Sequence, residues 1–93
     1  MKDKITEEKL SKYFNVTETA LKEVKKNIFK GKESEAKEII DMVENYISDA
    51  HHFEKNNNRV NAFAALNYAH GWIDSGVRLK IFEVNDDKLF TVC

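Results

Sequence analysis

The 93-residue sequence contains no proline and only three glycines, at Gly31, Gly71 and Gly76. All-β domains depend on many tight turns, and glycine and proline are among the residues that form them most readily. A few long helices need far fewer turns. The scarcity of turn-forming residues therefore argues against an all-β fold and predicts an all-α protein. A chain of this length has room for one domain, spanning residues 1–93.

Apolar residues recur at helical spacing in three separate stretches of the chain. Intervals of three and four residues place such side chains on one side of a helix. We therefore expect long helices at about residues 7–29, 35–55 and 59–82. Residues 83–93 would follow them as a short extended tail, because their turn-forming Asn and Asp residues precede an apolar, β-prone end.

The two connections between these helices are short. Gly31–Glu33 joins the first helix to the second, and Asn56–Asn58 joins the second to the third. Glycine is a natural helix-ending residue, and asparagine tolerates left-handed backbone angles and caps helices well. Thr6 and Ser34 are the expected N-caps of the first two helices. Short connections place consecutive helices antiparallel, so the sequence predicts an up-down-up three-helix bundle.

The predicted third helix carries two apolar seams, whereas the first has a single narrow stripe. One seam consists of Leu66, Ile73 and Val77, and the other of Ala65, Ala69, Trp72, Gly76 and Leu79. A helix with two seams packs against two partners, so the third helix should be central. We expect Trp72 in the core rather than as an exposed interaction anchor. The small residues, Gly76 among them, would let a neighbouring helix approach closely.

The remaining side of the third helix is almost free of charge. Between Val60 and Val77 the only formal charge is on Asp74. A helix this poor in charge all round is usually buried on all sides. The sequence therefore predicts that this side is covered, either by the apolar Leu89–Val92 end or by a second copy of the chain, which would make the protein a homodimer.

Polar side chains on this side are spaced so that they could form a hydrogen-bonded ladder, with Asp74 and Arg78 as an i,i+4 pair. The ladder could fix the register of the tail or of a dimer, or it could recognise an unknown partner or ligand. An ordinary solvated face is the third interpretation. The candidate binding residues are Phe63, Asn67, His70, Gly71, Asp74 and Arg78.

The same helix carries a family resemblance. The run from Ala62 to Leu79, with Asn67–Trp72 and Asp74–Arg78 as its most specific parts, resembles the signature of a family of short archaeal proteins catalogued as domain of unknown function 357. The resemblance extends upstream through Asp49–Phe53 and downstream to the Leu89–Val92 end. It implies a small helical protein of archaeal origin, and it implies no catalytic residues.

The sequence shows no recognisable catalytic or metal-binding motif. His51 and His52 are adjacent, so on a helix they point about 100° apart and cannot easily share an ion. His51 and Glu54 have the i,i+3 spacing of di-iron ligands in reverse order, but a di-iron bundle needs two Glu-x-x-His motifs and carboxylates from further helices. Cys93 is the only cysteine, and no serine lies in a nucleophile elbow. We expect a protein that is not an enzyme and needs neither metal nor cofactor.

The charge distribution and the hydropathy of the chain argue against nucleic acid and membrane as partners. The first 37 residues carry ten lysines against seven acidic residues, yet the whole chain has a net charge of −1. Acidic residues interleave with the lysines of the first helix, which is typical of a solvated face and argues against nucleic acid. No apolar run reaches the roughly 18 residues of a membrane span. Met1–Ile5 has no apolar segment behind its charges, so we expect a cytoplasmic protein without a secretory signal.

These observations favour a protein-interaction or structural module that acts through the uncharged side of the third helix. A nucleic-acid-associated protein using the lysine-rich first helix is the first alternative. A small-ligand or metal-binding helical protein is the second.

Overall fold

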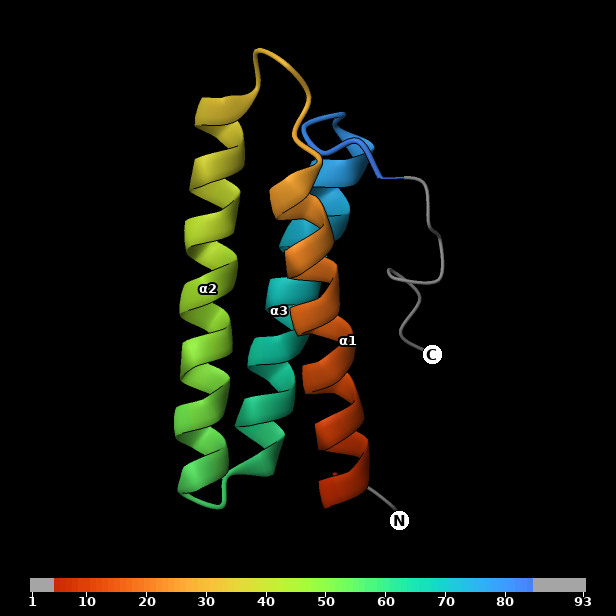
Figure 1. Cartoon of the computed structure of the whole chain (residues 1–93). Coiled ribbons are helices and arrows are strands. Elements are labelled where there is room, and N and C mark those ends of the chain that lie inside the picture. The colour runs from red at the N-terminus through yellow and green to blue at the C-terminus, as the bar shows by residue number, and fades with distance from the viewer. Residues whose placement is uncertain (1–4, 85–93) are drawn as a thin grey trace.

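The computed structural model describes residues 5–84 and shows three helices packed side by side (Figure 1). They are α1 (Glu7–Lys26), α2 (Glu33–Lys55) and α3 (Arg59–Arg78). Consecutive helices run antiparallel, with the α1–α2 connection at one end of the bundle and the α2–α3 connection at the other. The predicted all-α, up-down-up, three-helix bundle is confirmed.

Helix α3 is the central helix. It packs along α2 and also against α1, whereas α1 and α2 contact each other much less. In Figure 1 it lies between the other two. Both predicted seams of α3 contribute buried residues, as a helix with two neighbours requires. The largest fully buried side chains of the core come from all three helices and from the segment after α3: Leu10, Thr17, Val24, Val43, Leu66, Ile73 and Phe82.

Two of the three helices begin at side-chain caps. The Thr6 hydroxyl oxygen accepts a hydrogen bond of 3.1 Å from the Lys9 backbone N–H, as predicted. The Asn58 side chain accepts one of 3.2 Å from the Asn61 N–H. The prediction of Ser34 as the cap of α2 is wrong, because α2 already begins at Glu33 and Lys32 occupies the cap position without a side-chain bond.

Helices α1 and α3 both end earlier than predicted, at Lys26 rather than residue 29 and at Arg78 rather than residue 82. The residues expected to extend them pair with each other instead. The Phe29 N–H donates to the Ile81 carbonyl at 2.9 Å, and Ile28 and Phe82 form an isolated antiparallel bridge. These contacts hold the segment after α3 against the α1–α2 connection and bring the Phe82 side chain into the core.

Three residues with positive φ allow the chain to reverse at these ends. Gly31 has φ +91° between α1 and α2, and Asn57 has φ +60° between α2 and α3. Lys80, with φ +61°, turns the chain back after α3. Among residues 5–84, no helix is both long and apolar enough to cross a membrane. The predicted docking of the Leu89–Val92 end concerns residues outside the described part of the chain.

Candidate functional site

One side of α3 is not covered by any other element of the bundle within residues 5–84. Trp72 is 40% exposed and Leu79 is 68% exposed. The prediction that Trp72 lies in the core is therefore wrong. Ala65, Ala69 and Gly76, which belong to the same predicted seam, are buried. The seam is therefore only partly covered by the rest of the bundle. We call the uncovered side the α3 face; it consists of Val60, Ala64, Asn67, Tyr68, Gly71, Trp72, Ser75 and Leu79.

The centre of the α3 face is a shallow hollow with aromatic walls. It has a volume of about 310 Å³ and is lined by Asn67, Tyr68, Gly71, Trp72 and Ser75. Tyr68 is 63% exposed, and its ring stacks on that of Tyr46 from α2, with 5.5 Å between centroids. The Tyr68 wall of the hollow is therefore held in place by a contact with α2. It carries no formal charge, so its contacts would be apolar contacts and neutral hydrogen bonds.

The floor of this hollow is Gly71. A Cβ added at Gly71 would meet no atom within 4 Å outside its own helix backbone. The contrast with Gly76 is clear, because a Cβ there would lie 2.5 Å from the Phe82 ring. Packing inside the bundle thus requires a glycine at position 76 and does not require one at position 71.

The six predicted site residues do not share one surface. Phe63 packs edge-on against Tyr13 of α1, with 4.7 Å between ring centroids, and the Lys9 Nζ lies over the Phe63 ring, 5.7 Å from its centroid. His70 is buried, only 6% exposed. His70 is therefore covered and Phe63 partly covered inside the bundle itself, whereas the sequence predicted that the tail or a second copy would cover this side. For Phe63 the covering helix is α1.

The other four predicted residues lie at the surface. Asn67 and Gly71 belong to the α3 face. At its edge, the Arg78 guanidinium donates a hydrogen bond of 3.1 Å to the Asp74 carboxylate, which confirms the predicted i,i+4 pair. Tyr68 was missing from the predicted set. The sequence could have identified Tyr68 as a site residue by its position four residues before Trp72, since this spacing puts both rings on the same side of the helix.

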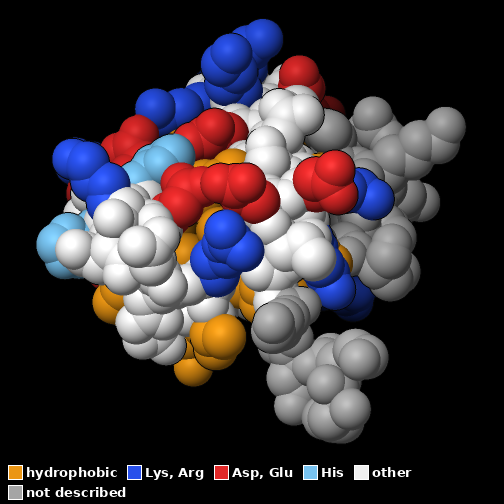
Figure 2. Space-filling model, turned by 90° about the horizontal axis from the view of Figure 1, so that it is seen from below, with side chains coloured by type: hydrophobic (Ala, Val, Ile, Leu, Met, Phe, Trp, Pro, Cys, Tyr) orange, Lys and Arg blue, Asp and Glu red, His pale blue; other side chains and the backbone are white. Residues whose placement is uncertain are grey.

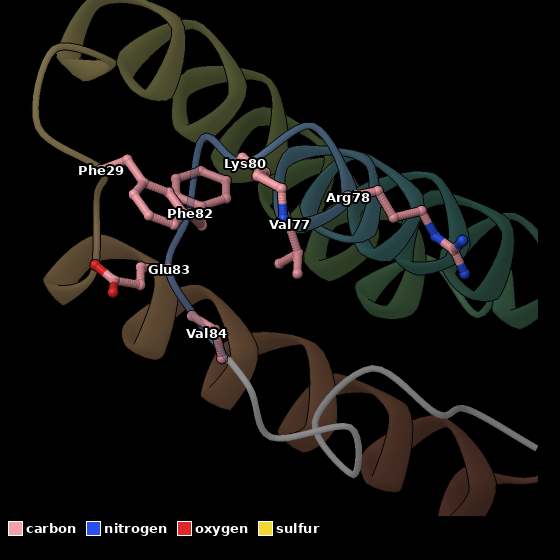
Figure 3. Close-up of a pocket in the computed structure, with 7 residues that line it drawn as sticks. All are labelled: Phe29, Val77, Arg78, Lys80, Phe82, Glu83 and Val84. Atoms are coloured by element: carbon pink, nitrogen blue, oxygen red, sulfur yellow. The ribbon is translucent and has the colours of Figure 1, made fainter.

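A second hollow, of about 470 Å³, lies at the end of α3 beside the α1–α2 connection (Figure 3). Its lining includes the rings of Phe29 and Phe82 and three charged residues, Arg78, Lys80 and Glu83. In Figure 3 the Arg78 side chain points away from the other lining residues, and its guanidinium is already bonded to Asp74. With both charge signs present and Arg78 engaged elsewhere, this hollow has no clear ligand preference.

The histidines of α2 make contacts within the bundle. The His51 ring stacks on Phe14 of α1 at 4.3 Å between centroids, and its Nε2 lies 3.1 Å from a Glu18 carboxylate oxygen. Glu54 approaches the other ring nitrogen at 3.9 Å. Within residues 5–84, no group of three or more His, Cys, Asp or Glu residues is arranged to hold a metal ion. His51 therefore contributes to α1–α2 packing.

The lysines of α1 do not form an isolated basic patch. Lys25 pairs with Glu44 of α2 at 2.7 Å, and Lys9 lies over an aromatic ring. On the end of the molecule that Figure 2 shows, acidic and basic side chains lie next to one another. Such an arrangement gives no continuous positive surface for a phosphate backbone on that end.

Sequence comparison places these features in a wider group. The family described as "Protein of unknown function (DUF357)" matches residues 12–82, a span that contains all of α2 and α3 and most of α1. No curated protein and no solved structure matches the chain.

Proposed function

We propose that this chain, which belongs to the DUF357 family of proteins of unknown function, is a cytoplasmic, non-enzymatic module that binds another protein through the α3 face. The observation that carries the proposal is Gly71, a glycine at an exposed position in the middle of α3, where the bundle leaves room for a side chain. Glycine in a helix costs about 1 kcal/mol relative to alanine. A partner that packs closely against α3 from outside the bundle would explain why residue 71 is a glycine, because a glycine lets another backbone or ring come near.

The composition of the α3 face favours a protein partner. Tyrosine and tryptophan are enriched at protein–protein interfaces, where they bury a large apolar ring and keep one polar group for a hydrogen bond. Tyr68 and Trp72 both line the hollow and are both exposed. Charged residues are depleted from the centres of such interfaces, and the α3 face has none. A nucleic acid would need positive charge at this place.

The proposal can be tested by capture of partners with matched variants. Gly71→Arg places a long charged side chain in the hollow, and the open space at this position should let the bundle fold normally. Ser48→Arg adds the same charge at an exposed position of α2 and serves as the control. Tagged wild type and both variants are incubated with an extract of the source cells, and the bound proteins are quantified by mass spectrometry.

We expect the wild type and Ser48→Arg to retain the same partner and Gly71→Arg to lose most of it. A thermal melt of each variant verifies folding. If all three proteins retain the same set in equal amounts, the α3 face is not the binding surface and the proposal is wrong.

A further inference from the structure

We propose that the partner on the α3 face is a second copy of this chain, packed with its α3 antiparallel to the first. The inference rests on the proposed function and specifies its partner. The face offers no charge that would select a partner of opposite charge. Its exposed groups are instead two large rings beside a row of small residues. The rings of one copy could therefore pack against the small residues of another copy. A surface of this kind can pair with itself across a two-fold axis.

The spacing along α3 fits such an axis. Tyr68 and Trp72 of the α3 face are centred on residue 70, and so are Leu79 of the same face and Asn61, an exposed residue in the first turn of α3. Residue 70 lies close to the middle of the Arg59–Arg78 helix, so a two-fold axis at this residue would use most of the length of α3. In an antiparallel pair, each position lies opposite its counterpart on the other side of the axis. Tyr68 would then contact the partner's Trp72, and the same contact would occur a second time across the axis.

The small residues of the α3 face nearly follow the same symmetry. Ala64 lies six residues before residue 70 and Ser75 five residues after it, so the centre of this pair is half a residue from residue 70, and Gly71 is one residue from it. In the antiparallel pair, Ala64 would lie beside the partner's Ser75, offset by about 1.5 Å along the helix axis. Small side chains at the crossing point let two helices approach closely. The open space above Gly71 is therefore the place where the two helix backbones would come nearest.

The available area indicates how strong this dimer should be. A helix of this length is about 30 Å long, and α3 with the adjacent edge of α2 presents a face roughly 20 Å wide, or about 600 Å² per copy. Standard stable interfaces bury about 800 Å² per partner. The area is thus near the lower end for a specific dimer. We expect a dimer in the micromolar range that dissociates on dilution.

The first test measures the mass of the purified protein in solution. Sedimentation velocity from about 5 to about 500 µM covers the expected range. The wild type and Ser48→Arg should change from monomer to dimer with concentration. Gly71→Arg and a second variant, Tyr68→Glu, should weaken the dimer at least about tenfold while keeping the wild-type helical spectrum.

The second test determines the orientation by cross-linking in a Cys93→Ser background. Ala64→Cys and Ser75→Cys are made as separate proteins. In the antiparallel pair a residue 64 lies about 18 Å along the helix axis from residue 64 of the partner, too far for a disulfide, which needs Cα atoms within about 7 Å. A mixture of the two proteins should therefore cross-link, and neither protein alone should do so. Cross-linking of Ala64→Cys with itself would contradict the antiparallel arrangement.

The two proposals fail in different ways. A wild-type protein that stays monomeric over the whole concentration range overturns the second-copy inference. If Gly71→Arg still abolishes capture from the extract in that case, another protein occupies the α3 face and the proposed function stands. A dimer that Gly71→Arg leaves intact also overturns the inference, because that dimer must use another surface. If Gly71→Arg changes neither the mass nor the capture, both proposals are wrong.

Discussion

The ring of Phe82 lies directly against the backbone of Gly76, where a Cβ would come within 2.5 Å of a ring carbon. Because Phe82 is buried and held by its bridge to Ile28, the ring has little room to move. Gly76→Ala should therefore destabilise the bundle by about 1–3 kcal/mol. Urea unfolding followed by circular dichroism measures this change, and a stability equal to wild type would contradict the packing described here.

The other helical glycine gives the opposite prediction. Gly71→Ala adds a methyl group in open space, and alanine favours the helix by about 1 kcal/mol over glycine. The free energy of unfolding of the monomer should rise by about 0.5–1 kcal/mol. The measurement is made well below the dimer concentration range so that association does not contribute. A loss of stability in Gly71→Ala would show that position 71 is packed after all.

Trp72 should behave as a surface residue in the monomer. It is 40% exposed, so Trp72→Ala should cost less than the roughly 3–5 kcal/mol of a buried tryptophan. Its fluorescence in dilute solution should be red-shifted and readily quenched by acrylamide. The emission should shift to shorter wavelength as the protein is concentrated, if the second copy covers it. Blue-shifted, unquenched emission at every concentration would contradict the exposed position.

Thr6 provides a local test of the start of α1. Its hydroxyl oxygen accepts the Lys9 N–H, and loss of an N-cap typically costs about 1 kcal/mol. Thr6→Ala should lower the free energy of unfolding by about this amount. Thr19→Ala, at an exposed position in the middle of α1, removes a hydroxyl without removing a cap. Equal effects of the two substitutions would show that the cap bond does not stabilise the helix.

The lysine-rich α1 yields a prediction about nucleic acid. Because its lysines are interleaved with acids and Lys25 is paired with Glu44, we expect no measurable binding to a random DNA duplex at about 0.15 M salt. Fluorescence anisotropy of a labelled duplex measures this directly. An affinity that is high at low salt and falls steeply as salt rises would instead support the nucleic-acid alternative.

The sequence by itself determined the features that depend on neighbouring residues. The apolar spacing predicted three helices, because side chains three and four residues apart share one side of a helix. Thr6 and Asn58 cap helices through bonds to residues only three positions away. Asn57 takes a positive φ in a connection where asparagine is well suited to it. The uncharged side of α3 could also be identified, because charge is a property of the residues alone.

Only the tertiary structure decided which side chains of α3 are covered. The pattern placed Trp72 in a core seam and His70 on the opposite side of α3, and the bundle exposes Trp72 and buries His70. Periodicity gives the angle between side chains around a helix, but the position of a neighbouring helix depends on packing with all the others. The early ends of α1 and α3 have the same cause, because the bridge between Ile28 and Phe82 joins residues that are distant in sequence. These tertiary contacts leave Tyr68, Gly71 and Trp72 together on one exposed face.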